Sequence, residues 1–266
     1  MTNADAQELI EVADQVADAA RAAILPWFRA QGLCADNKLA AGFDPVTEAD
    51  RAAERAMRDV LARLRPEDAV IGEEYGATAG QSGLTWVLDP IDGTRGFLSG
   101  TPTWGVLIAV GDAHGPVYGV IDQPYIGERF RGGLGVAAME GPQGARDLSV
   151  RGDRPLDEAT LFTTFPELGT GAEGAAFAEV AARARLTRYG MDCYAYALLA
   201  AGQIDLVIEA GLSDYDIQAP MAVIEAAGGI VTDWQGGPAQ HGGRVIAAAG
   251  RMQHDAALEV LAQVPA

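Results

Sequence analysis

The sequence is poor in cysteine and histidine, and these shortages narrow the chemistry open to it. Among its 266 residues are two cysteines, Cys34 and Cys193, so no disulfide scaffold is expected and a cytoplasmic location is the simpler interpretation. The three histidines, His114, His241 and His254, show no spacing typical of a zinc site. Zinc chemistry and nucleophilic cysteine chemistry are therefore both disfavoured.

Positive charge is also scarce. The 19 Lys and Arg residues stand against 37 Asp and Glu residues, which gives a formal net charge of -18. A nucleic-acid partner is not expected, because phosphate backbones are bound by clustered basic side chains that this sequence lacks. The acidity raises a question for any site that must hold an anionic substrate. Bound divalent cations are the usual means of inverting the local charge.

Long hydrophobic runs and low-complexity tracts are absent as well. No apolar run approaches membrane-spanning length, and the start of the chain lacks the basic region of a secretory signal, since Asp5, Glu8 and Glu11 precede Arg21. Neither membrane insertion nor export is expected. With 49% hydrophobic residues, the chain can nevertheless bury a substantial core.

The hydrophobic pattern predicts an α+β first half. Apolar residues recur at three-to-four spacing over residues 3–30, which predicts a helix, and a second helix is expected from Thr47 to a stop at Pro66. Short apolar, β-branched runs bounded by Gly, Pro or Asp predict strands. These runs are residues 69–71, 85–88, 105–110 and 117–121.

From about residue 145 the pattern becomes α/β. Strands are predicted at residues 160–164, 205–209 and 245–248, and helices at residues 174–184, 195–201 and 219–227. No flexible linker or internal repeat separates the two halves. We therefore predict two subdomains that share one interface, residues 1–144 and residues 145–266.

Residues 86–94, which read Trp-Val-Leu-Asp-Pro-Ile-Asp-Gly-Thr, carry the strongest chemical signal. An apolar strand runs into two carboxylates, and Pro90 is expected to stop the strand so that Asp89 and Asp92 converge. The Gly-Thr pair that follows can open a helix whose free N–H groups bind phosphate. A simple Asp-Gly turn is the alternative interpretation.

Two further acidic segments lie at the ends of predicted elements. Glu73 and Glu74 follow a strand, and Asp214 and Asp216 precede a helix. Each pair alone is typical of a solvated terminus or a helix cap. Together with residues 86–94, they supply the hard oxygen ligands that Mg²⁺ prefers. The three segments therefore predict a magnesium site.

In this order, the motifs resemble the inositol monophosphatase family, the lithium-sensitive, magnesium-dependent sugar phosphatases. The matching segments are residues 44–50 (Asp-Pro-Val-Thr-Glu-Ala-Asp), 72–74, 86–94, and 215–216 followed by 225–229. The resemblance covers nearly the whole chain. It implies a layered αβαβα sandwich, hydrolysis of a small phosphorylated metabolite, and a homodimer.

The resemblance also implies roles for the matching residues. One Mg²⁺ would be held by Glu73, Asp89 and the Ile91 carbonyl, a second by Asp89, Asp92 and Asp216, and a third, weaker ion by Asp50. Phosphate would be bound by Asp92, Gly93 and Thr94, and the Thr94 hydroxyl and Glu73 would position the attacking water. Asp50 also fits a helix capping box with Thr47, and the two interpretations are not exclusive. Lys38 is a further candidate near this region.

Asp192 indicates which substrate is bound. Inositol-specific members have a small uncharged residue at the matching position, whereas residues 190–194 (Gly-Met-Asp-Cys-Tyr) and 92–97 look similar to the histidinol-phosphatase branch. Histidinol phosphate carries an ammonium group, with which Asp192 and Glu209 could pair, and Asp216 would also contact the substrate. The alternative is that Asp192 caps the helix that follows it. Pro220 departs from the family pattern.

The expected function is hydrolysis of L-histidinol phosphate in histidine biosynthesis, with an inositol or related sugar phosphate as the alternative substrate. A metal- or metabolite-binding regulator is a second class of function. Residues 169–174 spell Gly-x-Gly-x-x-Gly, and the acid Asp192 lies beyond them, which imitates a dinucleotide site. Residues 166–168 (Pro-Glu-Leu) intervene between the predicted strand and the first glycine, so a strand-to-helix loop is the preferred interpretation.

Overall fold

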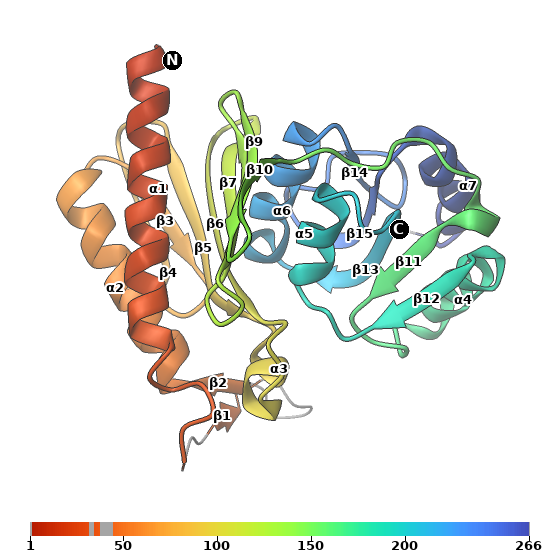
Figure 1. Ribbon diagram of the computed structural model, residues 1–266, viewed down its shortest axis with the longest axis horizontal. Helices are drawn as coiled ribbons and strands as arrows, with labels where there is room; N and C mark the ends of the chain where they lie inside the picture. The colour runs from red at the N-terminus through yellow and green to blue at the C-terminus, as the bar shows by residue number, and fades with distance from the viewer. Residues whose placement is uncertain (1, 32–34, 38–44, 266) are drawn as a thin grey trace.

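The computed structural model describes residues 2–31, 35–37 and 45–265, and its elements form five layers (Figure 1). Helices α1 (Asn3–Ile24) and α2 (Glu48–Leu64) cover the outer face of the first sheet. Helices α5 (Tyr194–Ala200) and α6 (Asp214–Ala226) lie between the two sheets, and α4 (Gly171–Arg183) and α7 (Arg251–Leu261) cover the outer face of the second. The predicted αβαβα sandwich is confirmed.

The first sheet has eight strands in the order β10-β9-β8-β7-β6-β5-β3-β4. They are β3 (Ala69–Gly72), β4 (Gly76–Thr78), β5 (Thr85–Asp92), β6 (Gly105–Asp112), β7 (Gly115–Gln123), β8 (Glu128–Gly133), β9 (Val136–Gly141) and β10 (Gly144–Asp147). All neighbours are antiparallel except β3 and β5, which are parallel. The carboxyl ends of β3 and β5 therefore meet at one edge of the sheet, which brings Glu73, just after β3, close to Asp89 and Asp92 at the end of β5.

The second sheet has five strands in the order β12-β11-β13-β15-β14. They are β11 (Thr160–Thr163), β12 (Leu186–Tyr189), β13 (Leu206–Leu212), β14 (Ile230–Asp233) and β15 (Gly243–Ala248). Strand β11 is parallel to both of its neighbours. Smaller elements are the two-stranded ribbon of β1 (Ala35–Asn37) and β2 (Pro45–Thr47), helix α3 (Thr94–Ser99) and a 3-10 turn (Leu156–Glu158).

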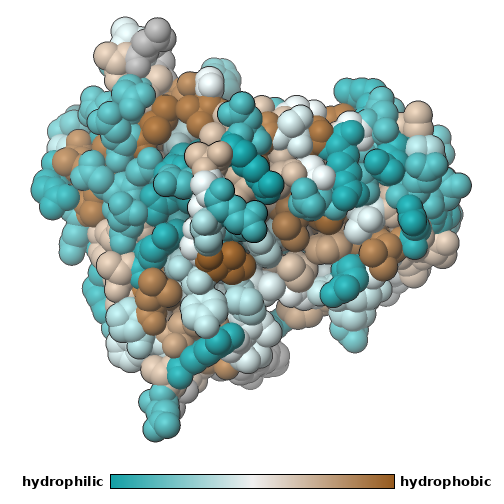
Figure 2. Space-filling view, in the orientation of Figure 1, coloured by the Kyte–Doolittle hydropathy of each residue, from teal (hydrophilic) through white to brown (hydrophobic). Residues whose placement is uncertain are grey.

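Helix α6 packs between the two sheets and carries Asp216 in its first turn. Gly119 of β7 and Gly132 of β8 lie directly beneath it, and a Cβ at either position would overlap with the backbone at Ala219 or Val223. These glycines let the helix approach the first sheet closely, and its buried face completes the central hydrophobic core. The face shown in Figure 2 is mainly hydrophilic, with hydrophobic residues in small separate patches. None of the helices within the described residues is long and apolar enough to cross a membrane.

Among the element boundaries that differ from the predictions, two involve prolines. Helix α1 ends at Ile24 and not at residue 30, because Pro26 has no N–H group with which to continue the helical hydrogen bonds. Strand β5 does not stop at Pro90 but runs on to Asp92. The pairing of β5 with β6 shifts register between Asp89 and Asp92, and such an irregularity accommodates a residue that cannot donate to the ladder.

Some elements of the fold were not predicted, and some predicted residues lie outside the part of the chain that the structure describes. Strands β8, β9 and β10 and helix α7 were not predicted, and Asp214 and Asp216 lie in the first turn of α6 and not before it. The core between the sheets is shared by both halves of the chain, so the boundary near residue 145 stays a prediction. Cys34, Lys38 and the start of the 44–50 motif lie outside the described residues.

Candidate active site

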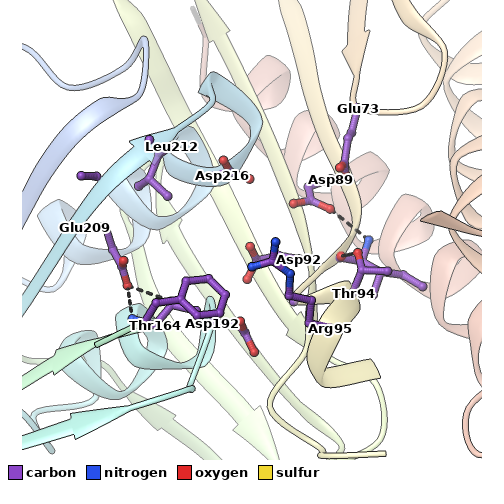
Figure 3. A pocket seen from close by; sticks show the side chains of 15 residues that line it. Glu73, Asp89, Asp92, Thr94, Arg95, Thr164, Asp192, Glu209, Leu212 and Asp216 are labelled. Carbon is purple, nitrogen blue, oxygen red and sulfur yellow. Dashed lines mark hydrogen bonds between the residues drawn. The ribbon is translucent and has the colours of Figure 1, made fainter. Parts of the chain in front are cut away.

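A cleft of about 230 Å³ opens where the carboxyl end of β5 faces the second sheet. One wall comes from β5, the residue after β3 and the start of α3, and the other from β13 and the segment after β11 (Figure 3). The lining residues are Glu73, Asp89, Ile91, Asp92, Gly93, Thr94, Arg95, Thr164, Phe165, Asp192, Glu209, Ala210, Gly211, Leu212 and Asp216. The cleft thus contains every predicted site residue except Asp50, which lies behind Thr94.

Three carboxylates meet in this cleft. One oxygen each from Asp89, Asp92 and Asp216 lies within 4.8 Å of the other two (Figure 3). A backbone amide orients each group: the Ile91 N–H donates to Asp89 over 3.0 Å, the Ser213 N–H to Asp216 over 2.6 Å, and the Cys193 N–H to Asp92. The acids predicted from three separate segments therefore form one cluster.

The electrostatics of the cluster suit a divalent cation. Burial raises the pKa of Asp89 well above its usual range, and the carboxylates of Glu73, Asp92 and Asp216 raise it further. Burial likewise raises the pKa of Asp92, with contributions from Asp192 and Asp216. Carboxylate oxygens this close together are the hard donor set of a Mg²⁺ site, and a bound cation would offset their repulsion. The residues present fit such an ion.

Glu73, Thr94 and Asp50 lie around this cluster. The Glu73 N–H donates to the Leu88 carbonyl over 3.2 Å, which extends the parallel pairing and places Glu73 beside β5. The Thr94 hydroxyl is 3.1 Å from the Ile91 carbonyl oxygen and 3.4 Å from an Asp50 carboxylate oxygen. Asp50 is buried and also accepts the Thr47 N–H, which confirms the capping box of α2. One carboxylate thus both caps a helix and contacts Thr94.

Gly93 and Asp192 approach each other closely. Gly93 has a φ of 86°, in the left-handed region, and a Cβ there would overlap with the Asp192 carboxylate. The Asp192 side chain accepts the Thr103 hydroxyl over 3.3 Å, and burial raises its pKa. Helix α5 begins after Cys193 with no side-chain cap. The alternative in which Asp192 caps this helix is therefore wrong.

Glu209 lies in β13, on the wall of the cleft that the second sheet forms (Figure 3). Its buried carboxylate accepts the Thr164 N–H over 2.7 Å, the Thr164 hydroxyl over 2.8 Å and the Thr163 hydroxyl over 3.2 Å. Burial raises the pKa of Glu209 to about 7, against the lowering effect of these hydrogen bonds. Both acids predicted to recognise the substrate therefore reach the cleft from the second half of the chain.

Arg95 and Phe165 are among the cleft residues that the sequence did not predict. The Arg95 guanidinium lies 4.9 Å from the centre of the Phe165 ring, so together they bridge the two walls at the mouth of the cleft. Arg95 directly follows the Gly-Thr pair, a position that could have drawn attention to it. Phe165 gave no comparable signal, because only the tertiary fold brings the end of β11 to the cleft.

The glycine-rich segment 169–174 takes no part in this cleft. Thr170 and Glu173 form a capping box at the start of α4, and Glu173 also accepts Arg244 over 2.7 Å. Gly169, with a φ of 55°, makes the turn into the cap. The interpretation of this motif as a strand-to-helix loop accounts for its geometry.

The layered fold and the acidic cleft define a class, the hydrolases that work through a carboxylate-held divalent cation. Comparison with known proteins narrows the class. The model of the inositol monophosphatase family matches residues 5–266. The chain belongs to this family. It is therefore a phosphatase, a phosphoric monoester hydrolase of a metal-dependent family that acts on small phosphorylated substrates.

Similar proteins carry more than one activity name. The chain is 39% identical to the chloroplastic bifunctional phosphatase IMPL2 of Arabidopsis thaliana, over 89% of this chain and 67% of that one. It is 36% identical to a histidinol-phosphatase of Streptomyces coelicolor, over 96% and 97% of the two chains. A solved inositol monophosphatase from Zymomonas mobilis superposes with a TM-score of 0.84 at 39% identity, covering 96% and 98%. Resemblance alone therefore leaves the substrate undecided.

Proposed function

We propose that this protein is a Mg²⁺-dependent histidinol-phosphate phosphatase. The observation that carries the proposal is the second acidic wall: Asp192 and Glu209 face the same cleft as the carboxylate cluster. A cationic group extending from a phosphate at the cluster would meet these two carboxylates, whereas a polyol would require neither charge. The likeness to the histidinol-phosphatase of Streptomyces coelicolor supports the same substrate.

The residues divide the work as follows. Glu73, Asp89 and the Ile91 carbonyl would hold one Mg²⁺. Asp89, Asp92 and Asp216 would hold a second. Asp50 would contact a third. When bound, the ions lower the pKa of the attacking water and offset the charge of the phosphate.

The remaining groups orient the reactants. Asp92, Gly93 and Thr94 would bind the phosphate, the latter two through backbone N–H groups at the start of α3. The Thr94 hydroxyl and Glu73 would hold the water in line with the bond that breaks. The Ile91 carbonyl and Asp50, at 3.1 Å and 3.4 Å, are the acceptors that would orient the Thr94 hydroxyl. Asp216 would contact the substrate as well.

A panel of phosphomonoesters tests the metal and the substrate together. Initial rates on L-histidinol phosphate, inositol 1-phosphate and a neutral sugar phosphate are compared with Mg²⁺ and with a chelator. We expect kcat/KM to be highest for histidinol phosphate and all rates to vanish with chelator. A higher kcat/KM on inositol 1-phosphate would refute histidinol phosphate as the preferred substrate. Mg²⁺ binding without turnover of any ester would instead favour a metal- or metabolite-binding regulator.

We also propose a homodimer. The edge strand β12 leaves Leu186 and Tyr189 exposed, and an edge strand with apolar side chains is a surface on which a second copy could pack. Light scattering coupled to size-exclusion chromatography measures the mass. A monomeric mass at micromolar concentration would refute this part of the proposal.

A further inference from the structure

Glu54 is a fully buried carboxylate beneath the loop that carries Glu73, and it takes no part in the cleft. It accepts the backbone N–H of Glu74 over 2.6 Å and that of Tyr75 over 3.2 Å. Its third donor is Arg58, one turn further along α2, over 2.7 Å. Burial of a charged carboxylate is costly unless such charge-assisted hydrogen bonds satisfy it.

Gly72 makes this arrangement possible. A Cβ at that position would overlap with all of the Glu54 carboxylate, so only glycine leaves room for it under the turn. The amides of three consecutive residues are then fixed: that of Glu73 by the Leu88 carbonyl, and the next two by Glu54. The backbone is thus held on both sides of Glu73, whose carboxylate lines the cleft.

We infer that Glu54 is a positioning residue that sets Glu73 for metal binding. Glu54 and Asp50 lie one turn apart on the same face of α2, so a single helix supports both Thr94 and Glu73. Residues that orient a metal ligand without touching the metal typically change metal affinity by roughly 10- to 100-fold. The inference rests on the metal site of the proposed function.

Mg²⁺ affinity of the full-length protein tests the inference without any substrate. Isothermal titration calorimetry measures the dissociation constant of Mg²⁺ for the metal-free wild type and for two variants, E54Q and G72A. E54Q removes a charge and one acceptor, whereas G72A keeps the charge but forces the carboxylate out from beneath the loop. We expect both variants to bind Mg²⁺ about tenfold more weakly. The double variant should bind no more weakly than E54Q alone, because the same contacts are lost.

Asp68 provides a matched control at the other end of β3. It is also a buried carboxylate, held by Arg65 over 2.7 Å and by the Trp86 indole N–H over 2.9 Å, and it lies outside the cleft. The D68N variant should lose thermal stability like the others while its Mg²⁺ affinity stays within about twofold of wild type.

Three outcomes would overturn the inference. If E54Q and G72A both bind Mg²⁺ like the wild type, Glu54 only stabilises the fold. If E54Q binds weakly and G72A normally, the effect is one of charge and not of position. If E54Q does not fold, G72A decides alone. A wild type that binds no Mg²⁺ would overturn the proposed metal site, and the inference with it.

Discussion

The two walls of the cleft are built in different ways. Glu73 follows β3, Asp89 and Asp92 lie at the carboxyl end of the parallel strand β5, and backbone amides orient the two aspartates. On the other side, Asp192 and Glu209 come from a loop and a strand of the second half, and the hydroxyls of threonines contact both. The first wall can serve any phosphomonoester, whereas the second can distinguish one ester from another.

If the residues of the first wall carry out the hydrolysis, substitution of Asp92 should cause the largest loss of activity. The D92N variant keeps an oxygen that can accept the Cys193 N–H but weakens the cluster as a metal site. We expect kcat/KM to fall more than about a hundredfold on every substrate, since even residues that only support ligands cost 10- to 100-fold. Steady-state rates measure this, and calorimetric melting checks that the fold is kept. Retained activity in a folded D92N protein would contradict the metal mechanism.

Asp192 should affect one substrate and not the other. Loss of a charged hydrogen bond costs about 1.5–3 kcal/mol, so D192N should raise KM for histidinol phosphate roughly 10- to 150-fold. For inositol 1-phosphate, kcat/KM should stay within about twofold of wild type, because specificity is a difference between two affinities. T103V is the matched control, since it removes the hydroxyl donor and keeps the charge. Equal losses of kcat/KM on both substrates would mean that Asp192 serves phosphate hydrolysis in general and does not recognise the substrate.

The same contrast explains what could be predicted from the sequence. The chemistry of the first wall is concentrated in residues 86–94, where consecutive residues supply two acids and the start of a helix. Local patterns also predicted the capping box of Thr47 and Asp50, which the structure confirms. Pro90 was misjudged because a lone proline disfavours a strand, whereas the register shift beside it makes room for one.

Other parts depended on contacts between distant residues. Strand β8 reads Glu-Arg-Phe-Arg-Gly-Gly, and its Arg129 is buried because Asp122, Asp14 and Asp18 surround it. No local pattern reveals such pairing. Glu54 is similar: it is an ordinary helix position in the sequence, and only the close approach to Gly72 shows where its carboxylate lies. The roles of the individual site residues stay predictions.

A smaller, pH-dependent effect should distinguish Glu209 from Asp192. With a pKa of about 7, Glu209 is charged at pH 8 and neutral at pH 6. E209Q should therefore raise KM for histidinol phosphate about fivefold at pH 8, as expected for roughly 1 kcal/mol, and leave it unchanged at pH 6. The ratio of variant to wild type at each pH cancels the titration of the substrate. A ratio that does not change with pH would contradict the assigned role.

Glu209 should also affect stability: at high pH its charged form favours substrate binding but destabilises the folded protein. Because the folded protein raises this pKa above its ordinary value of 4.5, the folded state holds the proton more tightly than the unfolded state. The stability contributed by the protonated form is complete below about pH 4.5 and is lost as pH rises toward 7. Urea unfolding should therefore show wild type losing stability relative to E209Q between pH 5 and about pH 8. A constant difference would mean that the pKa is not raised.

The smallest effect is expected in the glycine-rich loop, which does not line the cleft. T170A removes the side chain that accepts the Glu173 N–H at the start of α4. Loss of a helix N-cap typically costs about 1 kcal/mol, so urea unfolding should show a decrease of this size, while kcat and KM stay unchanged. A matched variant, T160A, probes a threonine in strand β11, whose side chain caps no helix. If T170A altered the kinetics, or if the wild type bound a dinucleotide and T170A did not, the loop would be a second functional site.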